Sequence, residues 1–326
     1  MNLKMDNDSQ TMADPNLEDV RICHFGRMDF KIEVVQTDEA TRTAIFHVVP
    51  DPRRYERATI DGEPHYIDKY LRTAISEELM IHMCTNQAKG LPFYDLSPRI
   101  ESAPKYATSR RAALDSELQG GGYVPPAEKP IAHHSLDIGA VEKNLVFLSV
   151  DICGSTALRR ADRTGFDRAY ELFVRELGTV VGQFNGTLLK VTGDGFIAYI
   201  DYPGFTEQCD HAIDMGLSFV FVLHESINPA LLNAGLPTLK IRVGADYGDA
   251  VVRQFEVSST GFVAHDIASD ALNRTVKIEQ SAGENEFRIG RRMYELIHVQ
   301  WLERTTEVPF DASGIGAPDY KIYKVN

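Results

Sequence analysis

Two aspartates that follow short apolar runs are the residues of this chain best suited to chemistry. Asp151 ends the run NLVFLSVD, whose Val, Leu and Phe content predicts a buried strand. Asp194 lies between two glycines at the tip of an expected hairpin, whose returning strand begins at Phe196. If these strands pair, their end carboxylates can share divalent cations, because Mg²⁺ takes one or two carboxylates plus phosphate oxygens. The pattern therefore predicts a metal-nucleotide site.

Ordinary turn chemistry is the alternative interpretation of each aspartate. A single Asp at a strand end is common, and so is a Gly-Asp-Gly hairpin tip. Neither stretch decides the matter alone, so the choice depends on the residues that follow farther along the chain.

The composition is that of a globular protein. With 326 residues the chain has room for two domains, or for one large domain with an extension. The net charge of −13 argues against a nucleic-acid partner, because binding a phosphate backbone needs clustered Lys and Arg. The four cysteines are far apart without a C-x-x-C pair, which predicts neither a zinc site nor a disulfide framework.

The sequence gives no sign of membrane insertion or export. No apolar run approaches the roughly 18 residues that a membrane span needs. The first residues, MNLKMDNDSQTMADPN, are polar and lack the apolar region of a signal peptide. We therefore expect a cytoplasmic protein with no membrane partner.

Changes in composition predict four segments. These are a disordered tail (1–16), a small α+β region of unknown role (17–97), a linker (98–140) and a larger domain (141–326). Within the second segment, alternating runs at 28–36 and 43–50 predict paired strands, and apolar spacing over 67–90 predicts an amphipathic helix. The larger domain alternates strands with long periodic helices, which predicts a mixed sheet flanked by helices.

Four motifs in the larger domain carry a resemblance to a known family. They are FLSVDICGST from Phe147, KVTGDG from Lys190, IRVGADYG from Ile241 and HDIASDALNRTVK from His265. In this order and spacing they resemble the catalytic domain of class III nucleotidyl cyclases, the adenylate and guanylate cyclase family, over about residues 143–326. The resemblance implies an α+β fold with a ferredoxin-like βαββαβ core.

The resemblance also implies a mechanism and its residues. Asp151 and Asp194 would hold two divalent cations, Mg²⁺ or Mn²⁺, which activate the ribose 3′-hydroxyl and neutralise charge on the phosphates. The chain over 152–156 would wrap the triphosphate, with Ser155 and Thr156 as substrate-binding residues. Plain helix capping is the alternative role of these two side chains.

The base and ribose contacts follow from the same motifs. Lys190 and Asp266 align with the pair that selects the base, and Asn273 aligns with the asparagine that orients the ribose. Four residues later, where the family has a catalytic arginine, this chain has Lys277, on the same helix face as Asn273. We rank Lys277 above the adjacent Arg274, and a solvated surface position is its alternative interpretation.

Members of the family work as head-to-tail dimers, so the resemblance implies a homodimer with sites at its interface. One subunit would supply Asp151 and Asp194. The other subunit would supply Lys190, Asp266, Asn273 and Lys277. A monomer would be inactive.

The choice of nucleoside triphosphate stays open at this point. One donor and one acceptor, Lys190 and Asp266, can contact adenine, cytosine or uracil, and the family's guanylate type normally has Glu at the Lys position. A cyclase without a membrane receptor or a recognisable sensor domain, and with Lys277 at the arginine position, resembles the bacterial Pycsar-type pyrimidine cyclases. These enzymes make cUMP or cCMP for a separate effector in antiphage defence. Adenylate cyclase is the alternative enzyme, and a degenerate nucleotide-binding regulatory module is the alternative of another class.

Overall fold

The chain forms two compact units in the computed structural model. The structure describes residues 21–22, 27–38, 43–87, 100, 102–134, 142–202 and 204–326. The first unit comprises residues 1–95 with His298–Leu302, and the second comprises 96–297 and 303–326. The predicted tail over 1–16 lies outside the described residues.

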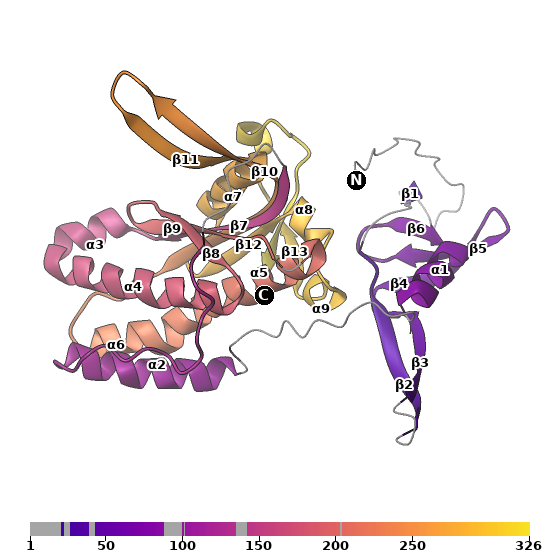
Figure 1. Ribbon diagram of the computed structural model, residues 1–326, viewed down its shortest axis with the longest axis horizontal. Helices are drawn as coiled ribbons and strands as arrows, with labels where there is room; N and C mark the ends of the chain where they lie inside the picture. Colours follow the sequence, from indigo (N-terminus) through magenta and orange to yellow (C-terminus); the bar gives the residue numbers. More distant parts are fainter. Residues whose placement is uncertain are drawn as a thin grey trace. The chain divides into compact units, whose positions relative to one another are not determined.

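The first unit is built from short strands and helices (Figure 1). Its elements are β1 (Arg21–Ile22), β2 (Phe30–Asp38), β3 (Thr43–Pro50), β4 (Tyr55–Ile60), β5 (Glu63–Asp68), β6 (Thr73–Ser76), α1 (Glu77–Gln87) and α9 (Val299–Leu302). One sheet has the order β1-β6-β5-β4, and β2 pairs with β3 in a separate antiparallel ribbon. The predicted strand pair is therefore confirmed.

The helix predicted over 67–90 is wrong in its first ten residues. Instead β5 ends at Asp68, a turn follows, β6 forms, and only then does α1 begin. The Asp68 carboxylate accepts hydrogen bonds from the backbone N–H groups of Tyr70 and Leu71, and Arg72 has a left-handed φ of 54°. A carboxylate that bonds its own following backbone favours a turn over a helix.

The segment predicted as a linker contains a packed helix, α2 (Ala103–Leu118). Its Tyr106 and Leu114 are buried. Arg110 donates two hydrogen bonds to the carboxylate of Glu176, of 2.7 and 2.9 Å, and both side chains are 2% exposed. The Gly and Pro content that suggested a linker belongs to the coil after this helix.

The second unit contains the remaining elements. They are β7 (Lys143–Ile152), α3 (Ser155–Ala161), α4 (Arg163–Gln183), β8 (Thr187–Val191), β9 (Gly195–Ile200), α5 (Phe205–Val222), η1 (Leu223–Ile227), α6 (Asn228–Asn233), β10 (Ile241–Val257), β11 (Phe262–Ala268), α7 (Asp270–Ser281), β12 (Glu286–Gly290), α8 (Arg291–Tyr294), β13 (Thr305–Val308), η2 (Ala312–Ile315) and β14 (Ile322–Val325). The sheet order is β13-β14-β12-β10-β7-β9-β8, with β11 paired to β10. Its β7-α4-β8-β9-α5-β10 part has antiparallel strands in the order β8-β9-β7-β10, which confirms the predicted βαββαβ core.

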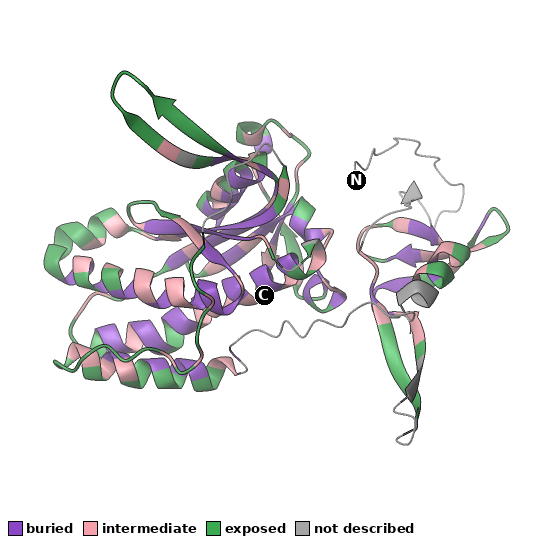
Figure 2. Cartoon of the chain, in the orientation of Figure 1, coloured by how far each residue is buried: buried purple, intermediate pink, exposed green. Residues whose placement is uncertain are grey.

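Different helices cover the two faces of this sheet, and alternation along the strands decides which residue meets which helix. On one face Phe196 packs between Phe173 of α4 and Phe219 of α5, with ring centroids 5.8 and 5.7 Å away. On the other face Phe147 packs in a cluster that includes Leu272 of α7. Because β7 is buried on both faces (Figure 2), its sequence is a continuous apolar run.

Among the residues that the structure describes, one helical run, Thr206–Asn233, is long and apolar enough to cross a membrane by length and composition. Half of its apolar window is buried inside the fold, and Phe219 and Ile213 are fully buried. Core helices of globular proteins pass the same test, so the run is explained by the sheet face that it covers.

The ion pair between Arg110 and Glu176 gives the first prediction. We expect Arg110→Ala to lower the free energy of unfolding by about 2 kcal/mol, because it removes two hydrogen bonds from a buried carboxylate and leaves only Arg175, 3.2 Å away, as its cation. Urea unfolding followed by circular dichroism measures this loss. The matched control is Arg111→Ala, which removes an exposed arginine 3.9 Å from Asp115 on the same helix and is expected to cost less than about 0.5 kcal/mol. Equal losses would contradict a structural role for α2.

Candidate active site

The two aspartates that the sequence singles out lie side by side. Asp151 is the penultimate residue of β7, and Asp194 directly precedes β9. In the register of these strands Asp151 is opposite Gly195, and the backbone N–H of Ile152 donates to the carbonyl of Asp194 at 3.3 Å. The strand pattern thus placed the two carboxylates together correctly, while their metal-binding role stays a prediction.

Gly195 makes this approach possible. A Cβ atom at this position would lie 2.0 Å from the carbonyl oxygen of Val150 and 3.0 Å from the Cα of Asp151. Any side chain would force β7 and β9 apart at the point where the carboxylates meet. The Gly-Asp-Gly pattern therefore reflects close strand packing as well as turn chemistry.

A cavity of about 310 Å³ opens beside the carboxylates. Its lining residues are Ser149, Asp151, Thr192, Asp194, Ile197, Arg242, Val276, Glu279 and Gln280. Sequence reasoning missed Arg242 and Glu279. Each carried a signal, because Arg242 interrupts the apolar pattern of a strand and Glu279 interrupts that of a helix. Arg242 donates a short hydrogen bond to Asp151, and its Nε lies 3.2 Å from Oε1 of Glu279.

The electrostatics of this cavity favour a positive ligand. Burial and the neighbouring Asp194 raise the pKa of Asp151, and Arg242 opposes this shift. Burial, with the negative charge of Asp151 next, raises the pKa of Glu279 to about 7. Arg242 therefore faces two carboxylates, Asp151 and Glu279, while Asp194 adds its charge beside Asp151. A cation would relieve the repulsion among these groups.

The carboxylate pair fits divalent cations in its chemistry. No group of three or more His, Cys, Asp or Glu side chains suited to a metal occurs in the described part of the chain. Two carboxylates would leave the remaining positions to water and phosphate oxygens, which is how Mg²⁺ is usually bound beside a nucleotide. Asp151 and Asp194 are the residues that would hold such ions.

Ser155 and Thr156 lie at the start of α3. The Ser155 hydroxyl donates a short hydrogen bond to the Asp194 carboxylate, and Thr156 is exposed. The N-cap residue of α3 is Gly154, and no side chain caps the helix there. The capping alternative is thus wrong for Ser155, which instead orients the neighbouring carboxylate.

Lys190 and Asp266 lie close to one another. The Lys190 Nζ is 3.9 Å from the Asp266 carboxylate, and each side chain is about half exposed, 48% and 51%. A β-bulge between Leu188 and Lys190 in β8 shifts the register against β9, which changes the direction in which the lysine points. The two residues come from β8 and β11 and leave their polar ends open to a ligand.

Asn273 and Lys277 are both exposed on α7, and neither lines the cavity beside Asp151. Arg274 faces the opposite way and is buried. Its Nε donates to Asp246 at 2.5 Å, and its guanidinium stacks over the ring of Tyr320. The helix period therefore leaves Lys277 as the accessible cation, as the sequence predicts.

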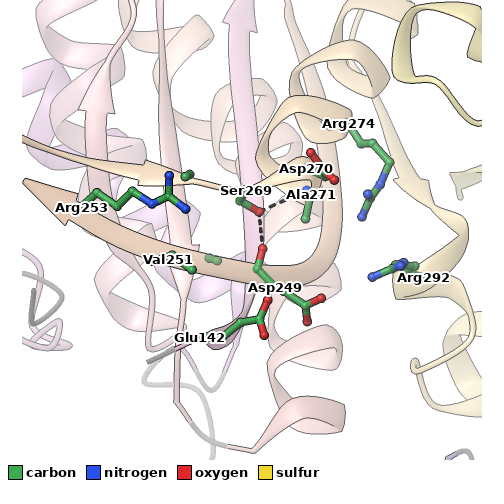
Figure 3. Close-up of a pocket in the computed structure, with 11 residues that line it drawn as sticks. Glu142, Asp249, Val251, Arg253, Ser269, Asp270, Ala271, Arg274 and Arg292 are labelled. Atoms are coloured by element: carbon green, nitrogen blue, oxygen red, sulfur yellow. Dashed lines mark hydrogen bonds between the residues drawn. The ribbon is translucent and has the colours of Figure 1, made fainter. Parts of the chain in front are cut away.

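A second, larger cavity of about 340 Å³ lies at the other end of β7 (Figure 3). Three arginines line it, namely Arg253, Arg274 and Arg292, and so do the carboxylates of Glu142, Asp249 and Asp270. These charges balance, and none of the predicted site residues lines this cavity. We therefore place the candidate active site in the smaller cavity, where the carboxylates converge.

No protein-family model and no curated protein matches the sequence. Solved structures to which the chain is similar include the guanylyl cyclase Cya2, at 18% identity and a TM-score of 0.49 over 58% of this chain and 94% of that one. The adenylyl cyclase CyaB from P. aeruginosa is 19% identical with a TM-score of 0.49, over 57% and 95%. The guanylate cyclase domain of RhGC from Catenaria anguillulae, in complex with GTP, is 14% identical with a TM-score of 0.49, over 57% and 98%. At these values the likeness assigns no activity, so any functional assignment depends on the site residues.

The raised pKa of Glu279 gives a second prediction. Its carboxyl group has a pKa of about 7 in the fold against an ordinary value of 4.5. The native state therefore keeps a proton that the unfolded chain releases, and stability falls as the pH rises through this window. The loss is about 3 kcal/mol at most.

Glu279→Gln removes this titration. In EDTA, we expect the variant to gain stability relative to the original chain progressively between about pH 4.5 and pH 7, measured by urea unfolding. Glu284→Gln, at an exposed carboxylate paired with Lys240, is the control for the same substitution outside the cavity. A difference for Glu279→Gln that stays constant with pH would contradict the raised pKa.

Proposed function

We propose that the chain is a nucleotidyl cyclase, which converts a nucleoside triphosphate to a 3′,5′-cyclic nucleotide and pyrophosphate. The observation that carries the proposal is the pair of adjacent carboxylates, Asp151 and Asp194, beside a cavity of about 310 Å³. The Lys190 and Asp266 pair, which the second subunit of a homodimer would contribute, adds a donor and an acceptor for a base. The enzyme class is a phosphorus-oxygen lyase.

The ribose 3′-hydroxyl loses its proton to solvent, and its oxygen bonds to the α-phosphorus. The bond from that phosphorus to the bridging oxygen breaks, and pyrophosphate leaves. Two divalent cations, when bound, lower the pKa of the 3′-hydroxyl and neutralise charge on the phosphates. Asp151 and Asp194 hold the charge that attracts them, and Ser155 fixes the second carboxylate by its hydrogen bond. Positioning dominates the catalysis because attack occurs within one molecule.

The exposed positions of Asn273 and Lys277 support a site shared between two copies of the chain. Both lie on an open helix face outside the cavity of Asp151 and Asp194. A head-to-tail homodimer would bring this face of one subunit to the carboxylates of its partner. Asn273 would orient the ribose, and Lys277 would meet charge that develops on the phosphates.

For the base we propose a pyrimidine, uracil or cytosine, and hence a cUMP or cCMP second messenger read by a separate effector in cytoplasmic antiphage defence. Lys190 and Asp266 supply one donor and one acceptor, which match either pyrimidine as well as adenine. The lysine at position 277 departs from the adenylate and guanylate pattern and favours the pyrimidine choice. An adenylate cyclase is the second candidate, because the same pair can contact adenine.

A panel of four nucleoside triphosphates with Mn²⁺ tests the substrate. We expect cyclic product from UTP or CTP alone, identified by mass spectrometry. Cyclic AMP alone would move the assignment to adenylate cyclase. No product from any substrate, together with measurable nucleotide binding, would favour a regulatory binding module.

Two single variants test the metal ligands. Asp151→Asn and Asp194→Asn are each expected to reduce turnover by at least about 100-fold while leaving the circular dichroism spectrum unchanged, because each removes charge from the cation site. Glu284→Asn is the control, since it changes an exposed carboxylate of the same unit. Full activity in either aspartate variant would contradict a two-cation mechanism.

Mixing two inactive variants tests the shared site. A heterodimer of Asp151→Asn and Lys277→Ala subunits has one site with both residues intact and one with neither. Refolding an equal mixture should therefore restore about a quarter of the original activity, because half of the dimers then carry one intact site of two. A mixture as inactive as its components would place all the residues of one site on one chain.

A further inference from the structure

Arg242 lies between two carboxylates and makes a hydrogen bond to only one of them. Its Nη2 donates to Oδ2 of Asp151. Its Nε lies 3.2 Å from Oε1 of Glu279, yet these two atoms are buried and neither has a hydrogen-bond partner. The guanidinium is therefore well bonded to Asp151 and misaligned toward Glu279.

The backbone fixes this arrangement. Arg242 is opposite Asp151 in the register of β10 and β7. Gly244, two residues later on the same face of β10, lets α7 approach so closely that a Cβ there would lie 2.3 Å from the backbone nitrogen of Glu279. The Glu279 side chain is only 5% exposed, and its second oxygen accepts a long hydrogen bond of 3.4 Å from Ser149.

A buried carboxylate oxygen without a hydrogen bond costs free energy. The fold therefore buries Oε1 of Glu279 without the hydrogen bond that would offset its loss of hydration. A small rotation of the Arg242 guanidinium would align Nε with Oε1 of Glu279. That rotation would weaken the bond to Asp151. The 3.2 Å separation of Nε and Oε1 leaves only a change of orientation between the present arrangement and a hydrogen bond to Glu279.

We propose that Arg242 is a positioning residue that stands in for the cations. In the cation-free protein it neutralises Asp151, and when divalent cations load it transfers its hydrogen bonds to Glu279. Arginine stays charged at any working pH, so it cannot yield to a dication by losing a proton and has to move. This inference rests on the proposed cation site. It adds that Arg242 neutralises the charge of Asp151 before divalent cations bind.

Cation affinity gives one readout. We expect Arg242→Gln to bind Mn²⁺ about tenfold more tightly in isothermal titration without nucleotide, because the competitor for Asp151 is gone. Glu279→Gln should bind about tenfold more weakly, because Arg242 then has no second partner. An unchanged affinity in the Arg242 variant would overturn the proposal.

Charge alone could shift both affinities in these directions, so a second readout follows the arginine itself. In protein labelled with ¹⁵N-arginine, the Nε–H signal of Arg242 is assigned by its loss in Arg242→Gln. Mg²⁺ should move this signal downfield as Nε gains a hydrogen bond, and the shift should vanish in Glu279→Gln. Arg288 is the internal control, because its Nε already donates to Glu286 at 2.8 Å and should not respond.

An Arg242 signal that stays unmoved at saturating Mg²⁺ would overturn the transfer to Glu279. Neither readout uses nucleotide or turnover. The expected shift together with no cyclic product would therefore remove the cyclase proposal and leave the role of Arg242 standing. Cyclic product together with an unmoved Arg242 signal would remove the proposed role of Arg242 and leave the cyclase proposal standing.

Discussion

The close approach of β7 and β9 at Gly195 is the constraint on which the candidate site depends. A Cβ atom there would meet the carbonyl oxygen of Val150 at 2.0 Å, so only glycine lets the two strands pair to their ends. Their pairing places Asp151 beside Asp194, and the resulting repulsion has to be compensated within a partly buried cavity. Strand geometry thus brings two negative charges together, and the surrounding side chains have to compensate them.

The side chains that compensate this charge lie on the face of the sheet that α7 covers. Arg242 from β10 bonds Asp151, and Glu279 from α7 lies on the far side of the same guanidinium. Farther along β10, Asp246 is paired with Arg274 of α7 and is fully buried. These two sets of charges tie α7 to β10 and fix its rotation. With that rotation set, Asn273 and Lys277 are left exposed on the open face of α7.

The first unit has its own buried charge cluster. Arg54 is fully buried and donates to both Asp29 and Asp68. Asp29 also accepts a hydrogen bond from the backbone of Val299, so a short segment from late in the sequence completes this unit. A buried charge needs several partners at once, which makes such a cluster sensitive to any change in the chain around it.

The sequence by itself determined the features that depend on neighbouring residues. The apolar run before Asp151, the glycines around Asp194 and the four-residue spacing from Asn273 to Lys277 were enough to predict strands, a hairpin tip and a shared helix face. Local spacing failed where a turn interrupts it, as at Asp68, and where composition hid a helix, as in α2.

Only the tertiary structure decided the partners of buried charges. Arg110 meets Glu176, and Arg242 meets Asp151 and Glu279, across long stretches of chain. Which charges meet depends on how strands pair and helices pack, and no short window of sequence contains that information.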